Sequence, residues 1–176
     1  MNRLTFDDGL LNTYEIAFPL MAKYELTGTV FVVTGILKGE LQNFRHDQAP
    51  YMNLQQVKQL HKAGWEIGSH SVTHPFFHTI TLEKAEWELH ESKRFLESRG
   101  FNVKAFAFPY GHGYYTDEQI KIAKEYYSEV RTVNDKRGLV NGIPVDKFPS
   151  KEEGVFVIHL VKDPKQFEGW IKNIRT

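Results

Sequence analysis

The sequence contains no cysteine among its 176 residues, so this chain forms neither a disulfide bond nor a thiolate metal site. Any metal that it binds must be held by histidine, aspartate or glutamate side chains. The lack of cysteine is compatible with a reducing or an oxidising compartment.

The chain also lacks a net charge and a long apolar run. Its 22 basic residues balance 22 acidic ones, and we expect no nucleic-acid partner, because affinity for phosphate backbones depends on clustered Lys and Arg. No run approaches the roughly 20 apolar residues of a membrane helix, so we expect no membrane span. No signal peptide is visible. As the sequence stands, we expect a cytoplasmic protein, or an extracellular one whose leader has been removed.

The length and composition fit one soluble globular domain that covers residues 1–176. Hydrophobic residues make up 41% and charged residues 25%, which is ordinary for such a domain. Aromatic residues reach 14%, and their flat faces suit both a protein core and a sugar ring. The oligomeric state stays open.

Short β-like runs alternate with amphipathic helical stretches along the chain. After a short first strand that ends near residues 4–5, the β-like runs cover residues 29–34, 65–69, 103–108, 129–133 and 155–161. Helices are expected near residues 12–24 and 120–127, and after the caps Asn53, Thr81 and Asp163. This alternation predicts a parallel sheet, either a barrel or an open doubly wound sheet. Both architectures place active sites at the carboxyl ends of the strands.

Two adjacent carboxylates, Asp7 and Asp8, follow the first expected strand. On a turn they project in different directions, so one can bind a cation while the other accepts a proton. The alternative is an ordinary Asp-Gly turn, which is common in proteins.

Two histidines, His70 and His74, follow a later strand with a spacing of four residues. In one helical turn this spacing places both imidazoles on one face, where they can reach one metal ion. Pro75 opposes a longer helix, so we expect His78 to be a solvated loop residue and not a third ligand. Two histidines and one carboxylate leave open metal positions, and a metal-bound water can have a pKa near 7.

Two further segments follow or end β-like runs. Tyr110 lies in a Pro-Tyr-Gly turn after a strand, where a backbone N–H could donate to a developing oxyanion, although a plain turn has the same sequence. His159 lies in an apolar strand, where a histidine is either a satisfied core residue or, near the functional edge, a general acid.

Taken together, these segments resemble the polysaccharide deacetylase family, carbohydrate esterase family 4, in the same order from Leu4 to His159. The segment Thr-Phe-Asp-Asp-Gly at residues 5–9 resembles the first motif of the family, and His-Ser-Val-Thr-His at residues 70–74 resembles the second. The resemblance implies an α/β fold, a distorted and often incomplete β/α barrel with parallel strands.

The resemblance also implies roles for individual residues. It implies a divalent metal, most commonly zinc, on Asp8, His70 and His74; cobalt, manganese and nickel suit the same ligands. Asp7 would be the general base, His159 the general acid, and the N–H of Tyr110 would help to stabilise the oxyanion. The candidate substrate-binding residues are Pro109, Tyr110 and Val157, the last at the position of a leucine that lines the acetyl-methyl pocket.

The sequence departs from the family pattern at two places. The family usually has an arginine that orients the base where this chain has Ala107. Arg131 is a candidate to supply that charge, although a structural salt bridge would equally explain it. The fourth motif, an aspartate with a tryptophan, has no clear match, and Asp135 and Asp146 are candidate substitutes.

The leading hypothesis is a metal-dependent deacetylase that removes an acetyl group from an N- or O-acetylated sugar or polysaccharide. Five aromatic residues are candidates to stack on a sugar ring: Phe76, Phe77, Tyr110, Tyr114 and Tyr115. One alternative is a catalytically impaired relative that binds carbohydrate, which the missing arginine suggests. Another is a deacylase of a small non-polymeric amide.

Overall fold

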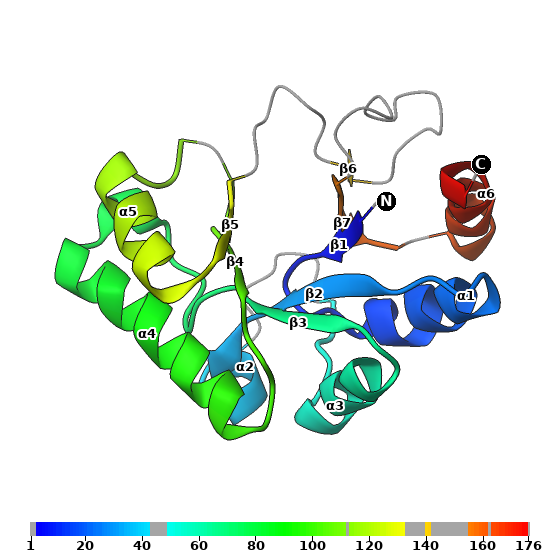
Figure 1. Cartoon of the computed structure of the whole chain (residues 1–176), viewed down its shortest axis with the longest axis horizontal. Helices are drawn as coiled ribbons and strands as arrows, with labels where there is room; N and C mark the ends of the chain where they lie inside the picture. Colours follow the sequence, from blue (N-terminus) through cyan, green and yellow to red (C-terminus); the bar gives the residue numbers. More distant parts are fainter. Residues whose placement is uncertain are drawn as a thin grey trace.

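The computed structural model of the chain describes residues 3–42, 49–111, 113–132, 140–141, 155–161 and 163–175. Within these ranges one sheet contains seven strands, and every neighbouring pair is parallel. The spatial order is β5-β4-β3-β2-β1-β7-β6 (Figure 1). The strands are β1 (Arg3–Phe6), β2 (Gly28–Val32), β3 (Glu66–Ser69), β4 (Ala105–Ala107), β5 (Glu129–Arg131), β6 (Val140–Asn141) and β7 (Val155–Leu160).

Helices follow most of the strands, as the alternating pattern predicts. They are η1 (Thr13–Ala17), α1 (Phe18–Lys23), α2 (Thr34–Lys38), α3 (Leu54–Lys62), η2 (Phe77–Thr79), α4 (Leu82–Ser98), α5 (Asp117–Tyr126) and α6 (Pro164–Arg175). The expected caps are confirmed. The side chains of Asn53 and Thr81 accept hydrogen bonds from backbone N–H groups in the first turns of α3 and α4, and Asp163 does the same for α6.

The sheet is curled, and helices α1, α3, α4 and α6 lie around its outside (Figure 1). β5 and β6 are the two edge strands, and no pairing joins them within the described part of the chain. The sheet is therefore an incomplete, distorted barrel of parallel strands, which confirms the fold expected from the sequence.

Apolar side chains fill both faces of the sheet, but in different ways. The face under the helices carries the main core, in which Phe6 packs on Trp65 with ring centroids 5.2 Å apart. The opposite, inner face carries a small cluster of Phe31 with Ala105 and Ala107. Small side chains are needed here, because a Cβ atom on the neighbouring Gly68 would lie 2.5 Å from the ring of Phe31. One phenylalanine thus fills this part of the curl.

The carboxyl ends of strands β1, β3 and β4 meet at one edge of the sheet because these strands are parallel. Asp8 follows β1, His70 follows β3 and Tyr110 follows β4. This arrangement confirms the expectation that these three segments, which carry candidate functional residues, lie at one edge of the sheet. Among the described residues, no helix has the length and apolar character needed to cross a bilayer.

Candidate metal centre

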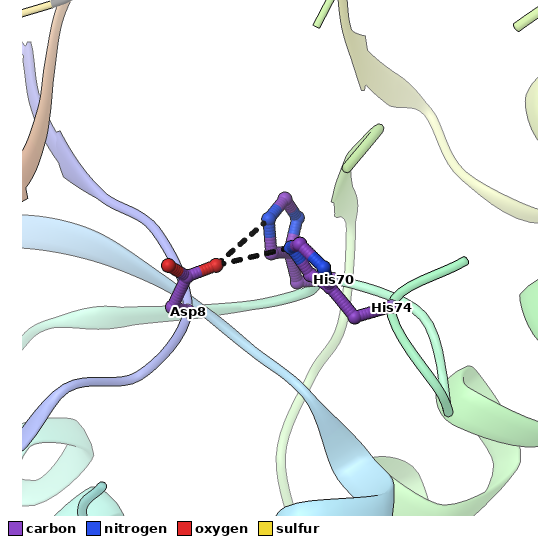
Figure 2. A group of neighbouring side chains, drawn as sticks. All are labelled: Asp8, His70 and His74. Carbon is purple, nitrogen blue, oxygen red and sulfur yellow. Dashed lines mark ion pairs between the residues drawn. The ribbon is translucent and has the colours of Figure 1, made fainter. Parts of the chain in front are cut away.

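Three side chains converge at this rim. The Oδ1 atom of Asp8 lies 3.4 Å from Nε2 of His70 and 3.1 Å from Nε2 of His74, and Figure 2 shows the carboxylate pointing at both rings. One ligand atom from each residue lies within 4.8 Å of the others. In the part of the chain that the structure describes, this is the one group of three such residues that could hold a metal ion. All three are buried.

The backbone at the end of β1 turns sharply to present Asp8. Asp8 has a φ of 68° and Gly9 a φ of 72°, so two successive residues occupy the left-handed region. A Cβ atom at Gly9 would lie 3.1 Å from Cγ1 of Val32 on the neighbouring strand, so glycine serves both the conformation and the close approach. The first motif is therefore a tight turn that lies directly over β2.

His70 is held by the strands on both sides of β3. Its backbone N–H donates to the carbonyl of Val32 at 3.0 Å, and its Nδ1 atom lies 2.8 Å from the carbonyl oxygen of Ala107. Because a carbonyl only accepts hydrogen bonds, Nδ1 carries a proton, so Nε2 is the ring atom left for a metal ion beside Asp8. This tautomer and orientation are those of a metal-ligating histidine.

His74 reaches the group through an irregular turn and not through a helical one. Ser71 and His74 have φ values of 70° and 56°, and the hydroxyl oxygen of Ser71 accepts a hydrogen bond from the N–H of His74 at 2.9 Å. The single helical turn inferred from the spacing is thus wrong, although both rings do converge. His78 is exposed and lies outside the group, as expected from Pro75.

Backbone strain is concentrated at this site. In the described ranges, five residues other than glycine have a positive φ: Asp8, Glu25, Ser71, His74 and Tyr110. Only Glu25 lies away from the rim. Each such conformation costs on the order of 1–3 kcal/mol and persists only where the surrounding structure enforces it. This distribution points to a functional site.

The three candidate ligands shift one another's pKa values. Burial alone would raise the pKa of Asp8, but hydrogen bonds and charge from His70 and His74 lower it below its usual range. Burial lowers the pKa of His74, and the neighbouring His70 lowers it further. Burial also opposes charge on His70, but the hydrogen bond to Asp8 and the charges of Asp7 and Asp8 raise its pKa. Asp8 is therefore an anion and His74 neutral at neutral pH, which are the forms that bind metals, whereas a metal ion would have to displace a proton from His70.

Asp7, Pro109 and Tyr110 lie around the group. Asp7 is buried, and its charge contributes to the raised pKa of His70. Pro109 is buried at the end of β4. The ring of Tyr110 lies edge-on to that of His74 with centroids 4.6 Å apart, and burial together with the charge of Asp8 raises the pKa of its phenol.

Arg131 has a structural partner. It lies on β5 opposite Ala107 in the register, and its guanidinium donates to Glu129 on the same strand at 3.0 Å. The salt bridge considered from the sequence is therefore present, and a role of Arg131 in orienting the base stays a prediction.

The remaining predicted residues lie on strand β7 or outside the described residues. The backbone of β7 pairs with β1, with Val157 opposite Thr5 and Ile158 opposite Phe6. Asp7 and His159 are each the next residue after the last registered pair, Phe6 and Ile158. The side chains of Val157 and His159 are not among the described ones, and Asp135 and Asp146 lie outside the described ranges.

Sequence reasoning missed Glu88, which is fully buried beneath the turn between the two histidines. Its carboxylate accepts hydrogen bonds from the N–H groups of Val72 and Thr73. The sequence held a signal, because Glu88 lies on the apolar stripe of α4 between Ala85 and Ser92, where an acid is unusual.

An exposed aromatic cluster adjoins the centre, formed by Phe76, Tyr110 and Tyr114. Phe76 and Tyr110 stack with centroids 3.8 Å apart, and Tyr114 lies 5.4 Å from Phe76. All three remain well exposed, at 42%, 39% and 39%. Of the other two stacking candidates, Phe77 is fully buried and Tyr115 stacks on Phe108, so both are packing residues.

Comparison with known proteins agrees with this geometry. The polysaccharide deacetylase family model matches residues 2–130. A peptidoglycan-N-acetylglucosamine deacetylase from Bacillus cereus is 32% identical over 69% of this chain and 51% of its own length. A poly-beta-1,6-N-acetyl-D-glucosamine N-deacetylase from Staphylococcus aureus is 26% identical over 69% of this chain and 43% of its own length. The chain spans about half the length of these relatives.

Solved structures share the fold at lower sequence identity. A family 4 carbohydrate esterase from Streptomyces lividans, in complex with acetate, has a TM-score of 0.71 at 20% identity and covers 98% of this chain and 84% of its own. A CE4 family pseudoenzyme from Bacillus anthracis has a TM-score of 0.73 at 21% identity, over 99% of this chain and 60% of its own. With a family model that matches most of its length, the chain belongs to the polysaccharide deacetylase family.

Proposed function

We propose that this chain is a metal-dependent deacetylase that hydrolyses the acetyl group of an acetylated sugar unit in a polysaccharide. The observation that carries the proposal is the convergence of three buried ligand atoms on strained turns at one rim of the sheet. The family membership supports the same chemistry.

The donor set fits a divalent cation, most commonly zinc, with cobalt, manganese or nickel as alternatives. Asp8 offers a carboxylate oxygen and His70 and His74 each offer an Nε2 atom, while the Nδ1 atom of His70 is already bound to a backbone carbonyl. Three protein ligands leave room for water and substrate. A bound cation would polarise the acyl carbonyl and lower the pKa of water.

The chain's own residues would then move the protons. Asp7 takes a proton from the attacking water as the new C–O bond forms at the acetyl carbon. The N–H of Tyr110 donates to the oxyanion that develops on the carbonyl oxygen. The bond between carbon and the sugar nitrogen or oxygen then breaks, and His159 gives that atom a proton, which releases acetate. The register of β7 beside β1 supports this pair of acid and base, because Asp7 and His159 each follow the last registered pair, Phe6 and Ile158.

The exposed aromatic cluster supports a carbohydrate substrate. Sugar rings present apolar C–H faces that pack on aromatic rings, and Phe76 and Tyr114 offer such rings beside the candidate centre. The two relatives from Bacillus cereus and Staphylococcus aureus are named for N-acetylglucosamine polymers. We therefore propose an N-acetylglucosamine polymer as the substrate class.

The test is acetate release from acetylated chito-oligomers, acetyl-ester sugars and small N-acyl amides, with zinc, cobalt, manganese or nickel added. Asp7→Asn is expected to lower kcat by about 100-fold or more and to leave the metal bound. Asp117→Asn, an exposed acid at the start of α5, is the control. Unchanged deacetylation by Asp7→Asn would contradict the mechanism.

Two other outcomes separate the alternatives. Stoichiometric metal without turnover of any acyl substrate would identify a catalytically impaired relative that binds carbohydrate. This alternative is suggested by Ala107, which stands where the family usually has an arginine. Turnover confined to the small amides would move the substrate away from polymers.

A further inference from the structure

One buried acid has no part in the chemistry proposed above. Glu88 lies on α4 with no exposed surface. Burying a carboxylate costs several kcal/mol unless the group is paired and hydrogen bonded. The carboxylate of Glu88 must therefore have hydrogen-bond or charge partners that offset this desolvation cost.

Those partners belong to the turn between the two candidate ligands. One carboxylate oxygen of Glu88 accepts from the N–H of Val72 at 2.8 Å and from the N–H of Thr73 at 2.9 Å. The other accepts from the hydroxyl of Thr73 at 2.6 Å and lies 3.0 Å from the ammonium of Lys84. Val72 and Thr73 lie in the middle of the segment from His70 to His74. Glu88 thus satisfies the backbone donors of a turn that has no regular secondary structure.

The turn needs such support because its conformation is strained. Ser71 and His74 both hold a positive φ, and neither is a glycine. The backbone N–H groups of Thr34 and Gly35 also donate to the carbonyls of Ser71 and Val72, at 3.1 and 2.9 Å. The turn is therefore clamped between the start of α2 and the carboxylate of α4.

We propose that Glu88 is a positioning residue of the metal centre, which holds the turn in the one conformation that aims both imidazoles at Asp8. Glu88 is not itself a ligand, because all four of its polar contacts are used on the turn and on Lys84. It acts through the backbone between the two histidines. The proposal rests on the proposed metal site, since it assigns Glu88 the task of shaping that site.

Two uncharged variants of similar size separate the acceptor role from packing. In Glu88→Gln the amide oxygen can still accept from the N–H groups of Val72 and Thr73. In Glu88→Met the side chain fills the same space but offers no oxygen, so both N–H groups lose their partner. Glu97→Gln, an exposed acid on the same helix, is the control.

The readouts are the dissociation constants for Zn²⁺ and Co²⁺ and the visible spectrum of the Co²⁺ form, all at a temperature where each variant is folded. We expect Glu88→Met to weaken metal binding about 10- to 100-fold, as loss of an outer-shell partner does, and to alter the Co²⁺ bands. Glu88→Gln should stay within about threefold of the original chain. A merely structural role would lower the unfolding free energy and leave both readouts unchanged, and that result would overturn the proposal.

Three further outcomes have distinct meanings. If Glu88→Met does not fold, Thr73→Val carries the test, because it removes one donor of Glu88 and leaves the acid in place; we expect about three- to tenfold weaker binding, and unchanged affinity would refute the role. If the unmodified chain binds no metal, the proposed centre fails, and the role of Glu88 fails with it. If the chain binds metal and Glu88→Met binds it equally well, only the role of Glu88 fails.

Discussion

The Nδ1 atom of His70 lies 2.8 Å from the carbonyl oxygen of Ala107. Strand β4 therefore orients a candidate ligand that follows the neighbouring strand β3. On the β4 side the contact uses the backbone carbonyl and not the side chain of Ala107, so it does not depend on the residue type at position 107.

The first prediction concerns that ligand. His70→Gln should weaken Zn²⁺ binding by more than about 100-fold, because it removes a ligand and not an outer-shell partner. His78→Gln, eight residues on and exposed, should leave the affinity unchanged. Isothermal titration with Zn²⁺ measures both variants. Equal losses in the two would show that His70 has no special place at the centre.

The second prediction concerns the missing arginine. Ala107 is buried against Phe31 on the inner face of the sheet, so Ala107→Arg would force a large charged group into a filled space. We expect it to lower the unfolding free energy by about 3 kcal/mol and not to raise activity. Urea denaturation and acetate release measure the two effects. A stable and more active variant would show instead that the inner face can accommodate the family arginine.

The third prediction uses two glycines with nearly equal φ. Gly9 has a φ of 72° and Gly39 a φ of 73°, but a Cβ at Gly9 would lie 3.1 Å from Val32, whereas one at Gly39 meets nothing within 4 Å. Both alanine variants should lose about 1 kcal/mol of stability through strain. Only Gly9→Ala should also weaken Zn²⁺ binding, because it displaces Asp8. Unchanged metal affinity in Gly9→Ala would argue against a close fit of the turn over β2.

The fourth prediction concerns alkaline pH. Tyr127 donates to the carbonyl of Leu89 at 2.7 Å, and burial raises the pKa of its phenol from 10.0 to about 12. The unfolded chain therefore releases this proton near pH 10 and the folded chain near pH 12. The contribution is fully present below pH 10 and is lost as the pH rises toward 12, with a loss of roughly 2–3 kcal/mol.

Tyr127→Phe isolates that contribution. It should cost about 1 kcal/mol at neutral pH through the lost hydrogen bonds, and its unfolding free energy should fall less steeply than that of the original chain between pH 10 and 12. Urea denaturation at several pH values compares the two slopes. Parallel slopes would mean that Tyr127 titrates alike in the folded and unfolded chain.

Local signals made the fold predictable from the sequence. Asn53 and Thr81 lie where their side chains can cap a helix, and the caps are present. The two-residue strand β6 and the five-residue helix α2 went unpredicted, because neither is long enough to show a hydrophobic period.

At the candidate site, residue types were predictable and backbone geometry was not. The ligand set of Asp8, His70 and His74 was expected, and the structure brings the three together. The left-handed conformations of Ser71 and His74 have no sequence signal, because neither is a glycine and long-range hydrogen bonds enforce them. The hydrogen bond from His70 to the carbonyl of Ala107 has no sequence signal either, because every residue has a backbone carbonyl.

The order of the strands has one more consequence. β2 lies between β1 and β3, so Asp8 and His70 follow strands that share no hydrogen bonds. A cation shared by their side chains would link two segments about sixty positions apart, and because the site forms only in the folded chain, its binding would stabilise the fold. The ion would also link β1 and β3, the two neighbours of β2, so that separating either of them from β2 would first require breaking a coordinate bond. A catalytic cation would in this way also stabilise the arrangement of β1, β2 and β3 against unfolding.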